Sequence, residues 1–144
     1  MKTTAIENLE AMRAFAKDFA RSLKGGEIIG LVGDLGAGKT TLVQMLAAAL
    51  GAKTKVHSPT FVLMRSIPVK GGKMGEIRSI LHADAYRIES EKEMIDAGFW
   101  ELAGKHDTVA LIEWADRMPS IHRLPNYREL TIRLIKGGSR EIDA

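Results

Sequence analysis

Cysteine is absent from this sequence, and long apolar runs are absent as well. Without cysteine the chain forms no disulfide, and thiolate nucleophiles and cysteine-bound metal sites are excluded. Without an apolar run near the roughly 20 residues that span a bilayer, no transmembrane helix is expected. The first residues, MKTTAIENLEAM, also lack the unbroken apolar core of an export signal, because Glu7 and Glu10 interrupt them. We therefore expect a cytoplasmic protein that makes no membrane contact.

Neither sign of charge dominates the composition. The net charge is +3, and hydrophobic residues make up 45% of 144 positions, which is the mixture of a folded globular protein. This length suits one compact domain covering residues 1–144. The isoelectric point of about 9.3 would fit a nucleic-acid partner. Acidic and basic residues are interspersed along the chain, however, so ordinary solubilising charge is the favoured interpretation.

The spacing of apolar residues predicts two helices and a buried strand in the first third of the chain. Apolar residues recur every three or four positions over 5–23, which predicts an amphipathic helix that ends at the glycines following it. The short apolar run EIIGLVG, 27–33, is typical of a strand buried on both faces. Residues 39–50 predict a second helix, which ends at Gly51.

The remainder of the chain is predicted to consist mainly of strands. Ser90 and Glu93 form a capping box, which predicts a short helix over 90–97. The glycines of VKGGKMG predict a hairpin. Strands are expected at residues 60–67, 76–83, 108–114, 127–135 and 140–143. Strands with few helices between them, after a helical first third, predict an α/β fold with a mixed parallel and antiparallel sheet.

The decade GDLGAGKTTL, 33–42, lies between the first predicted strand and the second predicted helix. It satisfies the pattern of glycine, four residues, glycine, lysine, and serine or threonine, and it does so in the structural context that this pattern requires. Glycine permits positive φ angles and a close approach of backbone amides to phosphate. The predicted phosphate-binding residues are Gly33, Asp34, Leu35, Gly36, Ala37, Gly38, Lys39, Thr40 and Thr41. The fold is therefore expected to be a three-layer P-loop NTPase-like fold.

The residue types in this loop each match one part of a nucleoside triphosphate. The first turn of the following helix adds unpaired amides and the positive end of the helix dipole. Lys39 supplies a point charge for the β and γ phosphates, and the Thr40 hydroxyl is placed to bind Mg²⁺. Thr41 is placed to reach the α phosphate. We therefore expect the loop to bind a nucleoside triphosphate together with Mg²⁺.

A triphosphate site also needs an acidic residue at the end of a neighbouring strand. Asp84 and Glu113 each end a predicted apolar strand, and the sequence leaves open which of them holds the metal. Strand alternation places His82, Asp84 and Tyr86 on one face. Thr60 follows a proline that restricts the preceding backbone. It is a candidate sensor of the γ phosphate, and a simple strand-start turn is the alternative interpretation.

ATP is the expected nucleotide. Guanine-specific P-loop proteins read the base with a tetrad that follows a strand, beginning with asparagine or threonine. The tetrad GKHD at 104–107 begins with glycine and precedes its predicted strand, so it resembles that motif only superficially. The histidines lack metal-ligand spacing, so no zinc site is expected.

Four segments together, GDLGAGKTTL, SPTF, HADAYR and IEWADR, occur in this order and resemble the TsaE family, formerly YjeE. This family comprises bacterial ATPases of tRNA threonylcarbamoyladenosine biosynthesis, and the resemblance covers nearly the whole chain. It implies an ATPase that works with the proteins TsaB and TsaD and reaches tRNA indirectly through their complex. It also implies that Lys39 holds phosphate, that Thr40 and Glu113 organise Mg²⁺, and that Asp84 positions the attacking water. Thr60 matches a switch-like element of the family.

Three other functions remain as alternatives. A small-molecule kinase shares the P-loop and the chain size, but it needs an acceptor pocket and an arginine-rich lid, for which no segment after Gly104 is long enough. A nucleotide-sensing module would bind ATP and hydrolyse it only incidentally. Direct tRNA contact is suggested by the isoelectric point alone.

Overall fold

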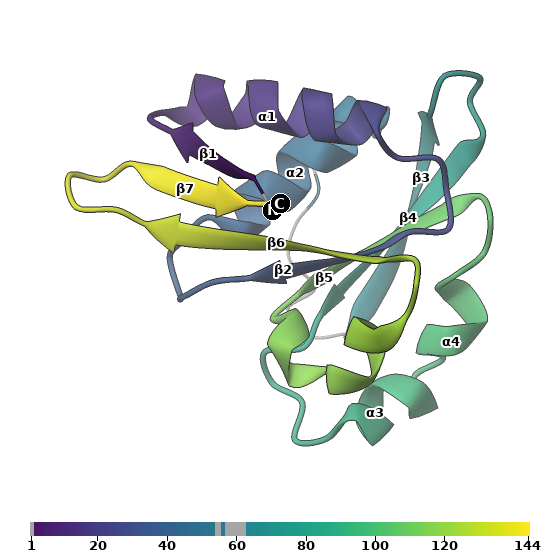
Figure 1. The fold of residues 1–144 in the computed structure, drawn as a ribbon. Helices are drawn as coiled ribbons and strands as arrows, with labels where there is room; N and C mark the ends of the chain where they lie inside the picture. Colours follow the sequence, from purple (N-terminus) through teal and green to yellow (C-terminus); the bar gives the residue numbers. More distant parts are fainter. Residues whose placement is uncertain (1, 54–55, 57–62) are drawn as a thin grey trace.

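A seven-stranded sheet organises the chain, with helices on both of its faces (Figure 1). The computed structural model describes residues 2–53, 56 and 63–144. The strands and helices in chain order are β1 (Thr3–Ile6), α1 (Leu9–Arg21), β2 (Ile28–Val32), α2 (Lys39–Ala49), β3 (Met64–Gly71), β4 (Ile77–Asp84), α3 (Glu91–Asp96), α4 (Phe99–Leu102), β5 (Thr108–Glu113), the 3-10 helices η1 (Ala115–Arg117) and η2 (Pro119–Arg123), β6 (Tyr127–Leu134) and β7 (Arg140–Asp143).

The centre of the sheet is parallel and its two margins are antiparallel. The strand order is β1-β7-β6-β2-β5-β4-β3. β2 pairs in parallel with β5 and with β6, and β4 pairs in parallel with β5. The β3–β4 and β6–β7 pairs are antiparallel, because short turns join their strands. The predicted α/β fold with a mixed sheet is confirmed, and so is the hairpin at the glycines after β3.

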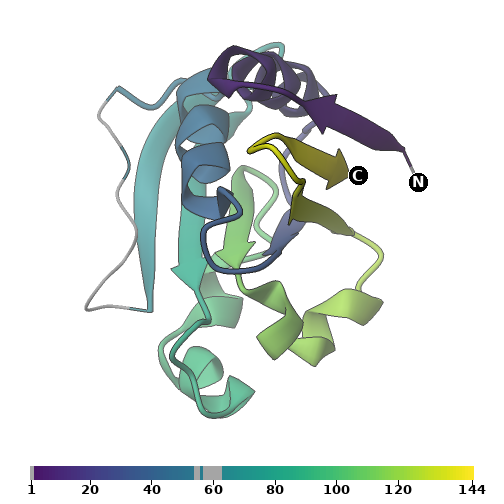
Figure 2. The same ribbon diagram turned by 90° about the vertical axis from the view of Figure 1, so that its left-hand side faces the viewer.

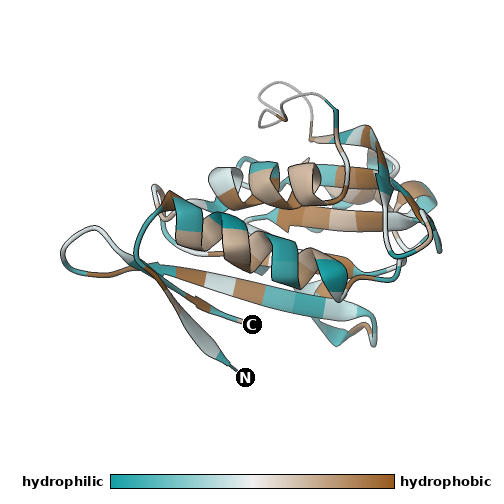
Figure 3. Ribbon diagram, turned by 90° about the horizontal axis from the view of Figure 1, so that it is seen from above, coloured by the Kyte–Doolittle hydropathy of each residue, from teal (hydrophilic) through white to brown (hydrophobic). Residues whose placement is uncertain are grey.

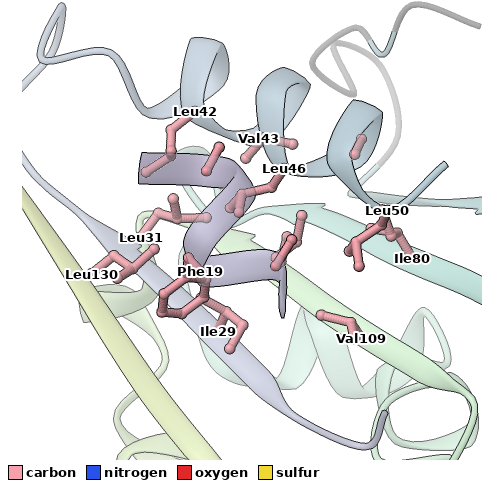
Figure 4. Packing of buried hydrophobic residues seen from close by; sticks show 14 of the residues in the cluster. Phe19, Ile29, Leu31, Leu42, Val43, Leu46, Leu50, Ile80, Val109 and Leu130 are labelled. Atoms are coloured by element: carbon pink, nitrogen blue, oxygen red, sulfur yellow. The ribbon is translucent and has the colours of Figure 1, made fainter. Parts of the chain in front are cut away.

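Each face of the sheet has its own hydrophobic core. α1 and α2 pack over one face around a cluster that includes Phe19, Leu46 and Val109 (Figure 4). α3, α4 and the 3-10 helices cover the opposite face around Phe99 and Ile112. Figure 3 shows hydrophilic residues along α1 and hydrophobic residues along the strands beneath the helices. The central strands are therefore buried on both sides, as the predicted three-layer arrangement requires.

The prediction of one helix over 5–23 is wrong at its beginning. Residues Thr3–Ile6 form β1, which pairs antiparallel with β7 at the other end of the chain. α1 begins only after Asn8, whose side chain accepts the N–H of Ala11 at 2.8 Å. This cap stops the helix from extending backwards. Apolar spacing alone does not distinguish a short strand from the first turn of a helix, and the partner strand is distant in sequence.

Other differences concern short elements. The strand expected at 60–67 begins at Met64 in the structure and continues to Gly71, and residues 60–62 lie outside the described residues. α4 and the two 3-10 helices were not predicted, because each is too short to show a helical period. The capping box of Ser90 and Glu93 does open α3. Within the described ranges, no helix combines the length and the apolar character that a membrane span requires.

Gly30 allows Tyr127 to pack against β2, so Gly30→Ala is expected to destabilise the fold. A Cβ at this position would lie 2.1 Å from Tyr127 Oη and 2.7 Å from Ala115 Cβ. We expect a loss of about 1–3 kcal/mol in the free energy of unfolding, measured by urea denaturation. Adding Tyr127→Phe should restore part of this loss, because it removes the nearest atom. An unchanged stability in Gly30→Ala would contradict this packing.

Candidate functional site

The glycine loop connects the end of β2 to the start of α2 (Figure 2). Gly36 and Gly38 have φ angles of +82° and +110°, in the left-handed region that glycine adopts without strain. Gly33 meets a different requirement, since a Cβ there would lie 2.5 Å from the carbonyl oxygen of Ile132. The loop therefore depends on glycine both for its curvature and for its close fit against β6.

Lys39, the first residue of α2, turns its side chain back into this loop. Its Nζ donates hydrogen bonds to the carbonyl oxygens of Gly33 at 2.6 Å and Asp34 at 2.8 Å. Nζ also lies 4.0 Å from the centre of the Trp114 ring, in a cation–π contact. Burial lowers the pKa of Lys39, and the carboxylate of Glu113 partly opposes this shift. A bound phosphate would supply negative charge next to this buried ammonium.

Glu113 connects β5 to the start of α2. Its Oε1 accepts a hydrogen bond from the Thr40 hydroxyl at 2.8 Å, and its Oε2 lies 2.7 Å from His82 Nε2. Only 3% of Glu113 is exposed, so these neighbours replace the water that a carboxylate ordinarily contacts. The structure thus joins a residue of the phosphate loop to one of the two predicted acids.

Asp84 lies at the end of β4, directly opposite Glu113 in the parallel β4–β5 register. The two acids therefore lie at the same edge of the sheet, because the carboxyl ends of parallel neighbouring strands meet there. Burial raises the pKa of Asp84, while a hydrogen bond from the backbone N–H of Tyr86 at 2.9 Å opposes the rise. Lys39 also acts on this carboxyl group electrostatically. Asp84 is therefore a separate, partly solvated acid beside the loop.

Sequence reasoning missed one residue that supports the loop from outside. Arg140, at the start of β7, donates from Nε to the carbonyl oxygen of Ala37 at 3.0 Å and from Nη2 to that of Gly36 at 3.4 Å. Its Nη1 donates to the carbonyl oxygen of Gly138 at 2.6 Å. No local signal marks this arginine, because the contact joins residues about a hundred positions apart.

Trp114 adopts a backbone conformation that is rare outside glycine. Its φ and ψ are 59° and 42°, in the left-handed region, directly after Glu113. Such a conformation costs of order 1–3 kcal/mol and persists where surrounding contacts determine it. Those contacts are the Lys39 ammonium and the Tyr86 ring, whose centroid lies 4.9 Å from that of Trp114. The strained residue thus places an aromatic ring against the loop lysine.

A cavity of about 180 Å³ adjoins the loop on the side of α1. It is lined by Ile6, Glu7, Asn8, Leu9, Met12, Gly38, Thr41, Gly138 and Arg140. Two of these, Gly38 and Thr41, belong to the predicted phosphate-binding residues. The cavity therefore continues the phosphate loop toward the start of α1.

The structure gathers most of the predicted site residues but not all of them. Thr60 lies outside the described residues, so its predicted role stays a prediction. Leu35, which belongs to the same predicted set, is 75% exposed. In the described part of the chain, no three or more histidine, cysteine, aspartate or glutamate side chains cluster as metal ligands.

The chain is similar to known proteins over most of its length. The family described as "Threonylcarbamoyl adenosine biosynthesis protein TsaE" matches residues 6–142. A Bacillus subtilis protein named tRNA threonylcarbamoyladenosine biosynthesis protein TsaE is 35% identical over 136 residues, which cover 94% of this chain and 79% of the relative. A protein of the same name from Streptomyces coelicolor is 36% identical over 108 residues, covering 73% and 68%.

The fold has a counterpart among solved structures. The crystal structure of Bacillus subtilis YdiB superimposes with a TM-score of 0.69 at 28% identity, covering 98% of this chain and 82% of that one. The seven-stranded mixed sheet with its glycine loop is thus the P-loop fold that the sequence predicts. Because the family match extends over nearly the whole chain in sequence and is accompanied by the same fold, this protein belongs to the TsaE family.

Proposed function

We propose that this protein is an ATPase that supports threonylcarbamoyladenosine formation on tRNAs that decode ANN codons. The observation that carries the proposal is the convergence of Lys39, Thr40 and Glu113 at the glycine loop. A lysine, a hydroxyl and a buried carboxylate in this arrangement match the phosphate and magnesium positions of P-loop enzymes. Family membership supplies the tRNA context.

The residues beside the loop fit Mg²⁺. Thr40 Oγ1 and Glu113 Oε1 lie 2.8 Å apart, and both are oxygen ligands of the kind that Mg²⁺ prefers. Mg²⁺ typically uses one or two protein oxygens together with phosphates and waters, which suits a site that lacks a larger acidic cluster in the described residues. Bound there, Mg²⁺ would neutralise charge that develops on the phosphates.

The protein's own groups account for the remaining chemistry. A water oxygen attacks the γ phosphorus, the bond to the β–γ bridging oxygen breaks, and ADP and inorganic phosphate result. Backbone amides of 33–38 and the Lys39 ammonium hold the phosphates. Asp84 orients the water and accepts its proton, because it ends β4 opposite Glu113 and its side chain is only partly buried.

The cavity beside the loop suits the nucleoside half of ATP. Thr41 and Gly38 line it where the α phosphate would leave the loop, and the exposed side chain of Leu9 offers an apolar surface to a base. Ligand sites of this kind combine apolar walls with a few polar groups, here including Arg140.

Leu9→Asp is therefore expected to weaken ATP binding about tenfold while leaving tripolyphosphate binding unchanged. Leu9 is 64% exposed at the first position of α1, where an acidic residue suits the helix dipole, so the fold should persist. Leu134→Asp is the matched control, since Leu134 is 57% exposed but lies outside the cavity lining. Calorimetric titration with both ligands measures the effect, and an equal loss for both ligands would exclude this base position.

The raised pKa of Asp84 predicts where the rate of ATP hydrolysis falls on the acidic side of its pH profile. Only the ionised carboxylate accepts a proton, so the rate falls as the pH decreases through this pKa. Because burial raises the pKa of Asp84, the fall should begin at a higher pH than for an ordinary aspartate, and ATP phosphates would raise it further. The measurement is kcat against pH at saturating ATP. If Asp84→Asn kept both the rate and this fall at acidic pH, Asp84 would have no such role.

We further propose that hydrolysis is slow in the isolated protein and faster with TsaB and TsaD. Arg140 donates its hydrogen bonds at the loop to the backbone carbonyl oxygens of Ala37 and Gly36. Phosphoryl transfer depends on neutralising the charge of the phosphates, which a partner protein would complete. ATP turnover would reset the TsaB–TsaD transferase between cycles, and tRNA would be reached indirectly. The test measures ATP hydrolysis and modified tRNA over many cycles, with and without the partners. A non-hydrolysable ATP analogue that supports full multiple turnover would favour a nucleotide-sensing module instead.

A further inference from the structure

His82 is completely buried in β4, and its imidazole contacts the carboxylate of Glu113. An ionised carboxylate only accepts hydrogen bonds, so Nε2 carries the proton and donates to Oε2 across 2.7 Å. His82 lies two residues before Asp84, which pairs with Glu113 in the parallel β4–β5 register. The contact therefore joins neighbouring strands at the edge of the sheet that carries the phosphate loop.

The two oxygens of Glu113 are held from different elements. His82 of β4 donates to Oε2, and Thr40 of α2 donates to Oε1. A rotation of the buried carboxylate would break both hydrogen bonds where water is excluded, which makes the observed orientation strongly preferred. If the Thr40 hydroxyl turned its lone pair to a cation, His82 would still hold the opposite oxygen.

The chemistry of imidazole suits this task. An imidazole protonated only at Nε2 donates one hydrogen bond and leaves the negative charge of Glu113 available to a cation, whereas lysine or arginine would neutralise it. Within the described ranges, Nδ1 of His82 has no hydrogen-bond partner. A buried polar atom without a partner costs stability, so packing alone does not explain a histidine here.

We infer that His82 is a positioning residue that orients Glu113 toward the Thr40 hydroxyl, at the place where Mg²⁺ would bind. This inference rests on the proposed ATPase function. Groups that orient metal ligands through hydrogen bonds typically change metal affinity by 10–100-fold when removed. His82 would therefore act on the magnesium dependence of nucleotide binding and leave phosphate binding itself intact.

Two amide substitutions separate positioning from packing. The amide nitrogen of His82→Gln lies about where Nε2 lies, whereas that of His82→Asn lies about where Nδ1 lies. The dissociation constant for ATP is measured by calorimetry with EDTA and again with Mg²⁺, and the ratio of the two gives the magnesium effect. We expect His82→Gln to retain most of this ratio and His82→Asn to reduce it about tenfold. The dissociation constant measured with EDTA should be unchanged in both variants.

His122→Asn is the matched control, because His122 Nε2 also hydrogen-bonds at 2.9 Å, to the carbonyl oxygen of Ala115, away from Glu113. It should leave the magnesium effect as in the native protein. An unchanged magnesium effect in His82→Asn would overturn the inference. Equal losses with EDTA and with Mg²⁺, or unfolding of both His82 variants, would assign His82 to packing and overturn it as well. A native protein that binds no ATP would refute the proposed function itself.

Discussion

Replacing Lys39 with alanine should reduce the rate of ATP hydrolysis by about 10²–10³-fold and prevent multiple turnover of tRNA modification. Lys39 is the cation that reaches into the glycine loop, where its Nζ contacts the carbonyl oxygens of Gly33 and Asp34. Loss of this buried charge would remove from a bound triphosphate the ammonium that lies inside the loop. Steady-state phosphate release and the yield of modified tRNA per molecule of protein measure the effect.

The control for this substitution is Lys92→Ala, since Lys92 forms an exposed ion pair with Asp96 on α3 and should leave hydrolysis unchanged. Thermal unfolding of both variants checks that the fold persists. Lys39→Arg tests the shape of the site, because Lys39 is only 5% exposed and a guanidinium does not match the space of an ammonium. If Lys39→Ala supported many cycles as well as the native protein, the proposed function would be wrong.

Glu113→Gln should decrease the rate of ATP hydrolysis by a similar factor, because the variant would bind Mg²⁺ more weakly. The substitution keeps the size of the side chain but removes the buried charge that faces Thr40. ATP binding in EDTA should persist or become tighter, because a carboxylate no longer repels the phosphates. The Mg²⁺ concentration that gives half-maximal hydrolysis should rise strongly.

Asp84→Asn is the matched comparison for this prediction, because it also removes one carboxylate at the same edge of the sheet. It should lower kcat with little change in the Mg²⁺ dependence, since Glu113 is the acid whose carboxylate accepts the hydrogen bond of Thr40. The reverse pattern, with Asp84 controlling the Mg²⁺ dependence, would exchange the roles of the two acids.

The position and curvature of the glycine loop could be predicted from the sequence because their requirements are local. Positive φ angles at Gly36 and Gly38, and a lysine that begins the next helix, are set by residue types at fixed spacing. The strand before the loop could be predicted for the same reason, since a short apolar run between glycines has few other interpretations. The predicted hairpin after β3 and the capping box of α3 are likewise local.

Contacts between distant segments could not be predicted in this way. Ala5 and Ile6 were predicted as the start of a helix, whereas they belong to β1, whose partner β7 lies at the opposite end of the chain. Arg140 supports the loop from β7 for the same reason. His82 was placed correctly on the face of Asp84, but its contact with Glu113 depends on which strands are neighbours.

The sequence alone determined that this chain forms an α/β fold with a glycine loop between a buried strand and a helix, and the resemblance of four short motifs indicated its family. Only the tertiary structure distinguished the surroundings of the two acids, because it places Glu113 in a hydrogen bond with Thr40 and Asp84 opposite Glu113 on the neighbouring strand. The assignment of Mg²⁺ to Glu113 stays a prediction. The physical reason is the range of the interactions. Backbone curvature and helix initiation are encoded by adjacent residues, whereas carboxylate orientation depends on strand order, register and burial, which arise only when the whole sheet is assembled.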